Sequence, residues 1–245
     1  MLTSFSSALN QTLGNARQCS FCLQHKETQA ACCASCYALL VANQMCRCQQ
    51  CFLNIAEPGV CGRCQTEPND FDSVFCLGDY QWPLEPVIKN YKYAKQMHLV
   101  KPLSQLLWAQ VKQQQICLPD VFCSVPLHWF KQWRRGFNQS DLLCQQVAKL
   151  AQRPVEQVLS RPRYGRSQAG LNRRQRQRAL TACFSSKSTI KSAHWVLIDD
   201  VVTTGSTANT LAKLLKNAGA NRVDIWAMAR TPNANTSRAD KKAVQ

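Results

Sequence analysis

The stretch from His194 to Thr207 reads HWVLIDDVVTTGST, and it decides the fold. Its first part is apolar, as expected for a strand that is buried inside a sheet. Its last part is rich in hydroxyl groups and precedes a helical pattern in which apolar residues from Leu211 to Ala218 share one face. Gly219 predicts the end of that helix. The segment therefore predicts a strand, a short loop and a helix in direct succession.

The loop in this segment has the chemistry of a phosphate-binding site. Free backbone N–H groups and the positive end of the helix dipole would point at an anion, and the hydroxyls add donors. Two acids before the loop are suited instead to accept hydrogen bonds from sugar hydroxyls or to bind a divalent ion. The alternative, an edge strand with Ser206 as a simple helix cap, explains neither the paired acids nor the paired threonines. The candidate residues are Asp199, Asp200, Thr203, Thr204, Gly205, Ser206 and Thr207.

Cysteine spacing is the second strong signal, because ten of the fifteen cysteines precede residue 65. Eight of them form four C-x-x-C pairs, and two such pairs supply the four sulfurs of a closed Zn²⁺ site. The predicted ligands are Cys19, Cys22, Cys33, Cys36, Cys48, Cys51, Cys61 and Cys64. We expect two structural zinc ions. Two consecutive ribbons, with ligands 19/22/33/36 and 48/51/61/64, are the simplest arrangement, and interleaved pairs are the other arrangement that the spacing allows. Redox-active cysteine pairs are the alternative.

Length and hydropathy limit the class of protein. The 245 residues allow one ordinary domain and a smaller module. We expect a double zinc-ribbon module over 1–66, a main domain over 71–232 and a disordered tail over 233–245. Because we find neither a membrane-spanning apolar run nor an export signal, we expect a cytoplasmic protein without direct membrane insertion.

Charge is concentrated in the second half of the chain. The formal net charge is +16, and residues 128–245 hold 21 basic and 6 acidic side chains. This excess predicts a polyanionic partner, such as a nucleotide, pyrophosphate or nucleic acid. Aromatic and basic side chains alternate over 128–140, which suits pyrophosphate or stacked single-stranded nucleic acid. The alternative is that the tryptophans cover the edge of the core and the arginines face water.

A second basic segment lies within 157–198, where the chain has no acidic residue. Seven arginines occur there in one stretch, and we expect their mutual repulsion to keep a loop mobile until an anion binds. A solvated basic face is the alternative. The arginines of both segments that we expect on the pyrophosphate or nucleic-acid side are Arg134, Arg135, Arg161, Arg173 and Arg176.

Several of these motifs resemble known families. The stretch HWVLIDDVVTTGST resembles the phosphoribosyl-pyrophosphate (PRPP) motif of type I phosphoribosyltransferases. The segments VPLH at Val125–His128 and RRGFNQS up to Ser140, the arginine-rich segment, the four C-x-x-C pairs and Lys92 beside an aromatic residue resemble the ComF family, in detail its GntX-like branch. The resemblance implies an α/β fold, a type I phosphoribosyltransferase-like parallel sheet with helices on both faces, preceded by a small zinc-ribbon module with four-cysteine sites.

The resemblance also implies a function. The acid pair would hold the ribose hydroxyls, the loop would hold the 5′-phosphate, Lys92 would lie on the pyrophosphate side, and Mg²⁺ would accompany PRPP. Members of the family are linked to competence, DNA uptake and DNA utilisation. One reading is therefore a phosphoribosyltransferase acting on PRPP or another phosphoribose nucleotide, with no catalytic side chain assigned. The alternative is a non-catalytic module that binds single-stranded DNA and docks a competence helicase or uptake-channel protein.

Overall fold

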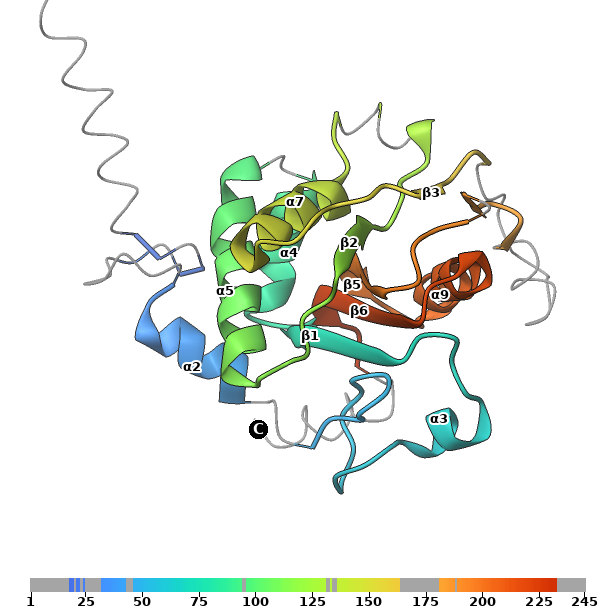
Figure 1. Cartoon of the computed structure of the whole chain (residues 1–245). Coiled ribbons are helices and arrows are strands. Elements are labelled where there is room, and N and C mark those ends of the chain that lie inside the picture. The colour runs from blue at the N-terminus through green and yellow to red at the C-terminus, as the bar shows by residue number, and fades with distance from the viewer. Residues whose placement is uncertain are drawn as a thin grey trace, which may run out of the picture.

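The computed structural model of the chain describes residues 18–19, 21–22, 24, 32–42, 46–93, 96–130, 133, 136–163, 181–187 and 189–232. At its centre is a sheet of four parallel strands, β1 (Ser73–Asp79), β2 (Val121–Ser124), β5 (His194–Val202) and β6 (Arg222–Arg230). The strands lie in the order β1-β6-β5-β2 (Figure 1). Parallel neighbours need crossover connections, which are usually helical. The predicted parallel α/β sheet is confirmed.

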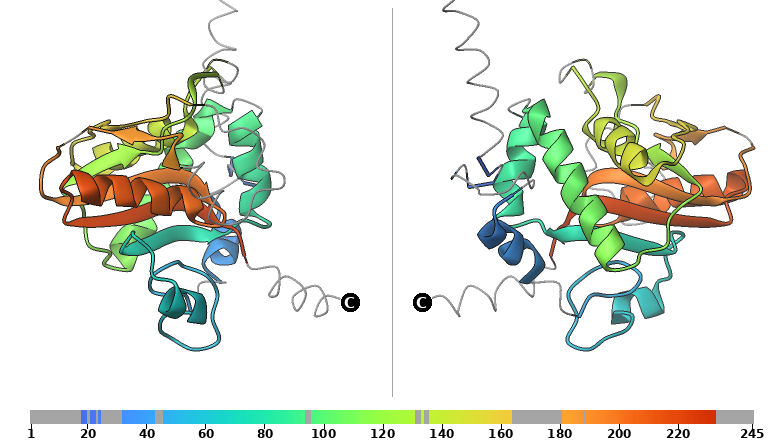
Figure 2. Two further views of the ribbon diagram at one scale, coloured as in Figure 1. Left: turned by 90° about the vertical axis from the view of Figure 1, so that its right-hand side faces the viewer. Right: turned by 60° about the vertical axis from the view of Figure 1, so that its left-hand side comes forward.

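Helices cover both faces of this sheet (Figure 2). On one face lie α4 (Leu84–Tyr93), α5 (Val100–Gln113) and α7 (Gln139–Ala151), and on the other lies α9 (Ser206–Ala218). A short 3-10 turn, η1 (Met97–Leu99), leads into α5. Among the residues that the structure describes, none of the helices has the length and apolarity to cross a membrane.

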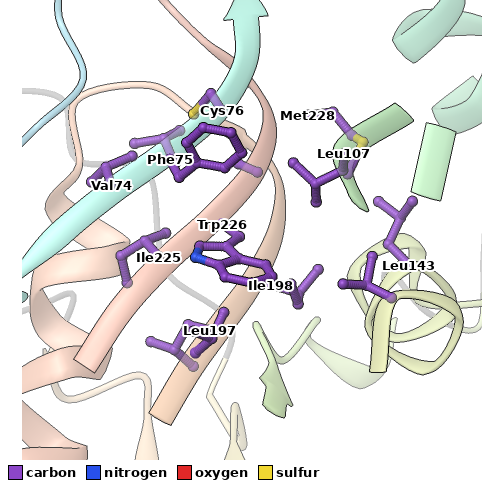
Figure 3. Close-up of a cluster of buried hydrophobic side chains, with 14 of the residues drawn as sticks. Val74, Phe75, Cys76, Leu107, Leu143, Leu197, Ile198, Ile225, Trp226 and Met228 are labelled. Atoms are coloured by element: carbon purple, nitrogen blue, oxygen red, sulfur yellow. The ribbon is translucent and has the colours of Figure 1, made fainter. Parts of the chain in front are cut away.

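Trp226 on β6 lies at the middle of the core (Figure 3). Its side chain is fully buried, and its ring centroid is 6.4 Å from that of Phe75 on β1 and 5.4 Å from that of Phe122 on β2. Leu107 of α5 and Leu143 of α7 are also fully buried and cover the same region. The strands are apolar along most of their length because helices exclude water from both faces.

Two element boundaries differ from the sequence-based expectation. The apolar stretch Val121–Leu127 predicts a buried strand over its whole length, but β2 ends at Ser124, because Pro126 has no N–H to continue the ladder. Ser140 precedes an apolar helical stripe, so the sequence predicts it as the N-cap of that helix. This prediction is wrong: Asn138 is the N-cap of α7, and its side chain accepts a hydrogen bond from the backbone N–H of Ser140. The Ser140 hydroxyl is therefore available to another partner.

The arginine-rich segment is flanked by a small ladder. β3 (Leu159–Ser160) pairs antiparallel with β4 (Ser185–Ser186), and these strands lie on either side of 164–180 in the chain. Residues 164–180 are outside the described part, as are residues 1–17 and the tail over 233–245. Arg134, Arg135, Arg173 and Arg176 also fall outside it.

The cysteine-rich segment contains α2 (Ala34–Ala42) and α3 (Gly62–Thr66), and it packs against the main sheet and α5. The Tyr37 hydroxyl donates to Oε1 of Gln113 at the end of α5, at 2.8 Å. Arg47 forms a 2.7 Å ion pair with Asp79 at the end of β1, with both side chains largely buried. The two parts of the chain are therefore joined by specific polar contacts.

A second buried cation, Arg230, ties the same regions together at the carboxyl end of β6. Its Nε donates to the backbone oxygen of Cys51 at 3.0 Å, and its Nη1 donates to that of Val202 at 3.0 Å. A third, longer bond reaches the backbone oxygen of Thr231 at 3.4 Å. One guanidinium thus connects the cysteine-rich segment with the end of β5.

Replacing this guanidinium tests its structural role. We expect Arg230→Met to lower the free energy of unfolding by about 3 kcal/mol, because it leaves buried carbonyl groups without donors. Urea denaturation of the full chain measures the change. The matched control is Lys216→Met, which removes a partly exposed 3.0 Å ion pair with Asp72 and should cost less than about 1 kcal/mol. Equal effects of the two substitutions would contradict the role given to Arg230.

Candidate functional site

The paired acids lie within β5, two to three residues before its end at Val202. Asp199 is partly buried, and its Oδ1 accepts hydrogen bonds from the Ser140 hydroxyl at 3.1 Å and from the backbone N–H of Asp200 at 2.8 Å. Asp200 forms a 2.9 Å ion pair with Lys92 of α4. The structure therefore brings Lys92, predicted to face pyrophosphate, into contact with the acid pair.

The two carboxyl groups have different electrostatic surroundings. Burial raises the pKa of Asp199 to about 7, and the neighbouring Asp200 carboxylate adds to the rise. The N–H of Asp200, Lys92 and Ser140 oppose this shift without cancelling it. Because like charges this close repel, a cation or a hydroxyl donor beside Asp199 would favour its ionised form. The pair can thus accept hydrogen bonds from a diol or contribute oxygen ligands to a divalent ion.

The hydroxyl-rich loop connects β5 directly to α9. The Thr204 and Ser206 hydroxyls lie 2.9 Å apart, and the Ser206 N–H donates to Thr204 Oγ1 at 3.3 Å. Gly205 is the N-cap of α9 and has a φ of +82°, a conformation that side chains disfavour. The loop therefore presents hydroxyls and the first N–H groups of a helix at one place, the usual arrangement for an anion.

The other side of this loop is held by the linker before β1. The Asp70 N–H donates to Asn209 Oδ1 at 2.6 Å, and Asn209 Nδ2 donates to Asp70 Oδ2 at 2.9 Å. A Cβ on Gly205 would lie 3.8 Å from the ring of Phe71. These contacts fix the start of α9 against residues that are distant in the sequence, so the loop has a defined position.

Ser140 and Asn209 also belong to this site, although neither is among the candidate residues named from the sequence. The sequence predicts a capping role for Ser140, but its hydroxyl contacts Asp199 instead. A signal was present, because Asn138 two positions earlier is a capping residue as good as serine. Asn209 carried no such signal, because its partner Asp70 is 139 positions away.

Exposed aromatic side chains follow β2. Trp129, Phe130 and Trp133 are 65, 43 and 78% exposed. The Trp129 and Phe130 ring centroids are 6.0 Å apart, and the Phe130 and Trp133 rings stack at 6.5 Å. The interpretation that these tryptophans cover the core edge is therefore wrong, because they face solvent as an aromatic triplet. This aromatic triplet offers flat apolar surfaces to a ligand.

A hollow of about 380 Å³ lies beside the aromatic triplet, between the ends of β2 and β3. Trp129, Asp141 and Arg161 contribute to its wall. The Arg161 guanidinium also lies over the Phe184 ring, with its Cζ 4.9 Å from the ring centroid, which is a cation–π contact. Arg161 is the one residue of the predicted arginine set that the described part contains, and it borders a hollow rather than standing alone in solvent.

The eight paired cysteines form two separate clusters of four. Within each cluster the possible ligand atoms all lie within 4.8 Å of one another. One contains Cys19, Cys22, Cys33 and Cys36, and the other contains Cys48, Cys51, Cys61 and Cys64. The pairs are thus consecutive rather than interleaved. Two tetra-cysteine clusters of this kind have the donor set of a closed, structural metal site.

Backbone N–H groups surround one sulfur in each cluster. Cys19 Sγ accepts from the N–H of Phe21 at 3.4 Å and of Cys33 at 3.3 Å, and Cys48 Sγ accepts from that of Cys61 at 3.2 Å. Burial opposes ionisation, yet these bonds lower the pKa of Cys19 to about 6 and that of Cys48 to about 7. Each cluster therefore already favours a thiolate, the form that binds metal.

The second cluster adjoins the hydroxyl-rich loop. Cys51 and Cys64 border the same small hollow as Thr204 and Gly205. Asn69 Nδ2 donates to Cys64 Sγ at 3.4 Å. The next residue, Asp70, makes the linker's contact with Asn209 of α9. Folding of the second cluster and the position of the loop are therefore physically connected.

Comparison with known proteins identifies relatives of this chain. A model of the phosphoribosyl transferase domain matches residues 143–245. DNA utilization protein YhgH of Escherichia coli O6:H1 is 38% identical over 190 residues, which cover 75% of this chain and 84% of that protein. Competence protein F of Haemophilus influenzae is 35% identical over 178 residues, which cover 69% of this chain and 78% of that protein.

The glutamine phosphoribosylpyrophosphate amidotransferase of B. subtilis aligns with a TM-score of 0.41 and 18% identity, covering 57% of this chain and 30% of that one. Family membership follows from the two sequence relatives together with the domain match. The chain belongs to the ComF family, which includes competence protein F and DNA utilization protein YhgH, and it carries a phosphoribosyl transferase domain.

Proposed function

We propose that the chain binds PRPP, or a nucleotide that carries 5-phosphoribose, and that it acts in competence or DNA utilisation. The observation that carries this proposal is the succession of Asp199, Asp200 and the Thr203–Thr207 loop at the junction of β5 and α9. The loop would hold the 5′-phosphate through hydroxyls and helix N–H groups. The carboxylates, which precede the loop on β5, would accept hydrogen bonds from the ribose hydroxyls.

Charge at the site is suited to a pyrophosphate ester. Lys92 already neutralises Asp200 at 2.9 Å, and it would turn toward the pyrophosphate once sugar hydroxyls engage the acid. Carboxylate oxygens at the acid pair fit Mg²⁺, which is usually bound by one or two carboxylates together with substrate phosphates. When bound, such an ion would neutralise the leaving group. Transfer of phosphoribose would then depend on positioning and charge stabilisation.

We also propose that the two tetra-cysteine clusters hold zinc. All eight ligands are cysteines, N–H groups already favour thiolates, and the clusters are closed. Zinc would be structural, because a small segment with little core gains its folding free energy from the metal. A reducing compartment keeps such thiols available for metal, so we place the protein in the cytoplasm.

A second candidate function is binding of single-stranded DNA, either with or without phosphoribosyl transfer. The aromatic triplet is the specific observation that favours it, because stacked and exposed rings provide platforms for bases. The excess of 21 basic over 6 acidic residues in 128–245 would attract the strand. In this reading the zinc-binding segment would dock a competence helicase or an uptake-channel protein.

Zinc content can be counted directly. We expect two zinc ions per purified chain by metal mass spectrometry, and about one in Cys51→Ser, because three sulfurs cannot close the second site. Cys46→Ser is the matched control, since Cys46 is nearby but belongs to neither cluster. It should retain two ions. Loss of zinc from the control, or none from Cys51→Ser, would contradict the assigned ligands.

The sugar site can be tested by calorimetric titration with PRPP and Mg²⁺. We expect the double variant Asp199→Asn and Asp200→Asn to abolish binding, because it removes both negative charges beside the sugar. Glu85→Gln is the control, because Glu85 lies at the opposite end of α4 from Lys92. In the described contacts its carboxylate forms an ion pair with the exposed Lys89. Unchanged affinity in the double variant would exclude the acid pair as the sugar site.

The same titration has an expected pH dependence. The pKa of Asp199 is raised to about 7, so the protonated acid persists well above its ordinary range. If metal-bound PRPP needs the ionised form, affinity should rise about tenfold from pH 6 to pH 8, as the ionised fraction does. Asp199→Asn separates this contribution from titration of the ligand's own phosphates. An equal pH slope in that variant would refute it.

Binding of single-stranded DNA can be tested by fluorescence anisotropy at fixed salt. We expect Trp129→Ala together with Trp133→Ala to weaken binding at least tenfold, because each lost stacking contact is worth about 1–3 kcal/mol. The control is Trp82→Ala, which removes a tryptophan that is 67% exposed but outside the aromatic triplet. Equal losses in both variants would show that the triplet has no special role.

A further inference from the structure

The opposite end of β5 holds a second group of reactive side chains. Cys117, between α5 and β2, has its Sγ 4.0 Å from Nδ1 of His194, the first residue of β5. The other ring nitrogen of His194, Nε2, lies 2.8 Å from Oδ2 of Asp224 on β6. A thiol, an imidazole and a carboxylate are therefore aligned in that order.

The sheet itself holds this alignment in place. The backbone N–H of His194 donates to the Asp120 side chain at 2.9 Å, and the Asp120 N–H donates to the His194 oxygen at 2.9 Å. Asp224 is almost completely buried, and Arg222 donates to it through Nε at 3.0 Å. The imidazole is thus fixed both by its backbone and by its carboxylate partner.

The tautomer of the neutral His194 ring follows from its partner. Burial opposes ionisation, but bonds from His194 and Arg222 keep the pKa of Asp224 below its ordinary value. An ionised carboxylate only accepts hydrogen bonds, so Nε2 must carry a proton. In the neutral ring, Nδ1 is then an acceptor, and it faces the Cys117 thiol. This is the arrangement of a nucleophile, a base and an orienting acid.

Exposure distinguishes Cys117 from the other cysteines outside the two clusters. Among the described cysteines of this group, Cys117 is exposed and Cys46 is half-buried. The others are buried: Cys32, Cys76, Cys123, Cys144 and Cys183. Burial raises the pKa of Cys76 to about 12 and that of Cys123 to about 11, which makes both poor nucleophiles. Only Cys117 in this group combines exposure with a base.

We infer that Cys117, His194 and Asp224 form a modification site at which the thiol exchanges with small-molecule disulfides. His194 Nδ1 takes the thiol proton, and the thiolate attacks one sulfur of the disulfide. The disulfide bond breaks as the new sulfur–sulfur bond forms, and the leaving thiolate takes the proton from His194. The products are a mixed disulfide on Cys117 and one free thiol, so the disulfide is the only oxidant needed.

Peptide mass spectrometry of the full, zinc-loaded chain after incubation with glutathione disulfide tests this inference. We expect the mixed disulfide to form on Cys117 at least about tenfold faster than on Cys46. His194→Gln should slow the reaction at Cys117 about tenfold and leave Cys46 unchanged. Cys117→Ser should remove the modification. Equal rates at Cys117 and Cys46, or an unchanged rate in His194→Gln, would overturn the inference.

A pH–rate profile of the unaltered chain provides a readout that does not depend on a variant folding. A thiol without a base reacts about tenfold faster per pH unit up to its ordinary pKa near 8.5. The rate at Cys117 should rise less steeply with pH than the rate at Cys46 in the same chain, because His194, held between Asp120, Asp224 and Arg222, accepts the thiol proton. Equal pH slopes at Cys117 and Cys46 would refute assistance. Titration of the modified chain with PRPP measures the proposed phosphoribose site separately, because that site lies at the other end of β5. Failure of PRPP binding would therefore leave the result at Cys117 unaffected.

Discussion

The structure depends on a buried guanidinium at the carboxyl edge of the sheet. Arg230 reaches Cys51 of the second cysteine cluster and Val202 at the end of β5 through bonds of 3.0 Å each. A buried charge without such partners would cost several kcal/mol, so its bonds specify how these segments meet. Arg47 and Asp79 make a second buried link between the same two regions. The cysteine-rich segment is thereby part of the support of the sheet.

This support has a direct consequence for the hydroxyl-rich loop between β5 and α9. Thr204 and Gly205 lie beside Cys51 and Cys64, and the linker that follows the second cluster is bonded to Asn209 of α9. The loop is therefore held by β5, by α9 and by the cysteine-rich segment. A loop that presents N–H groups to an anion works best when those groups need no reorganisation on binding. In this family member, the cysteine-rich module contributes to that rigidity.

Much of the architecture was predictable from local patterns. The cysteine pairs, the buried strand before the acids and the apolar stripe of α9 are each encoded within a few turns or residues, where spacing alone constrains geometry. Boundaries were less predictable, as Ser140 shows, because Asn138 and Ser140 compete for one cap and their tertiary partners decide the outcome. Assignment to the GntX-like branch and the roles of the arginines at 134, 135, 173 and 176 stay predictions.

The sequence by itself determined the class of the fold, the two sets of candidate metal ligands up to their pairing, and the loop suited to phosphate. Only the tertiary structure decided that the cysteine pairs are consecutive, that Lys92 meets Asp200, and that Cys117 meets His194. The physical reason for the Cys117 contact is the order of the strands. β5 lies between β2 and β6, so the segment before β2 meets the first residue of β5, and local spacing carries no information about contacts between segments so distant along the chain.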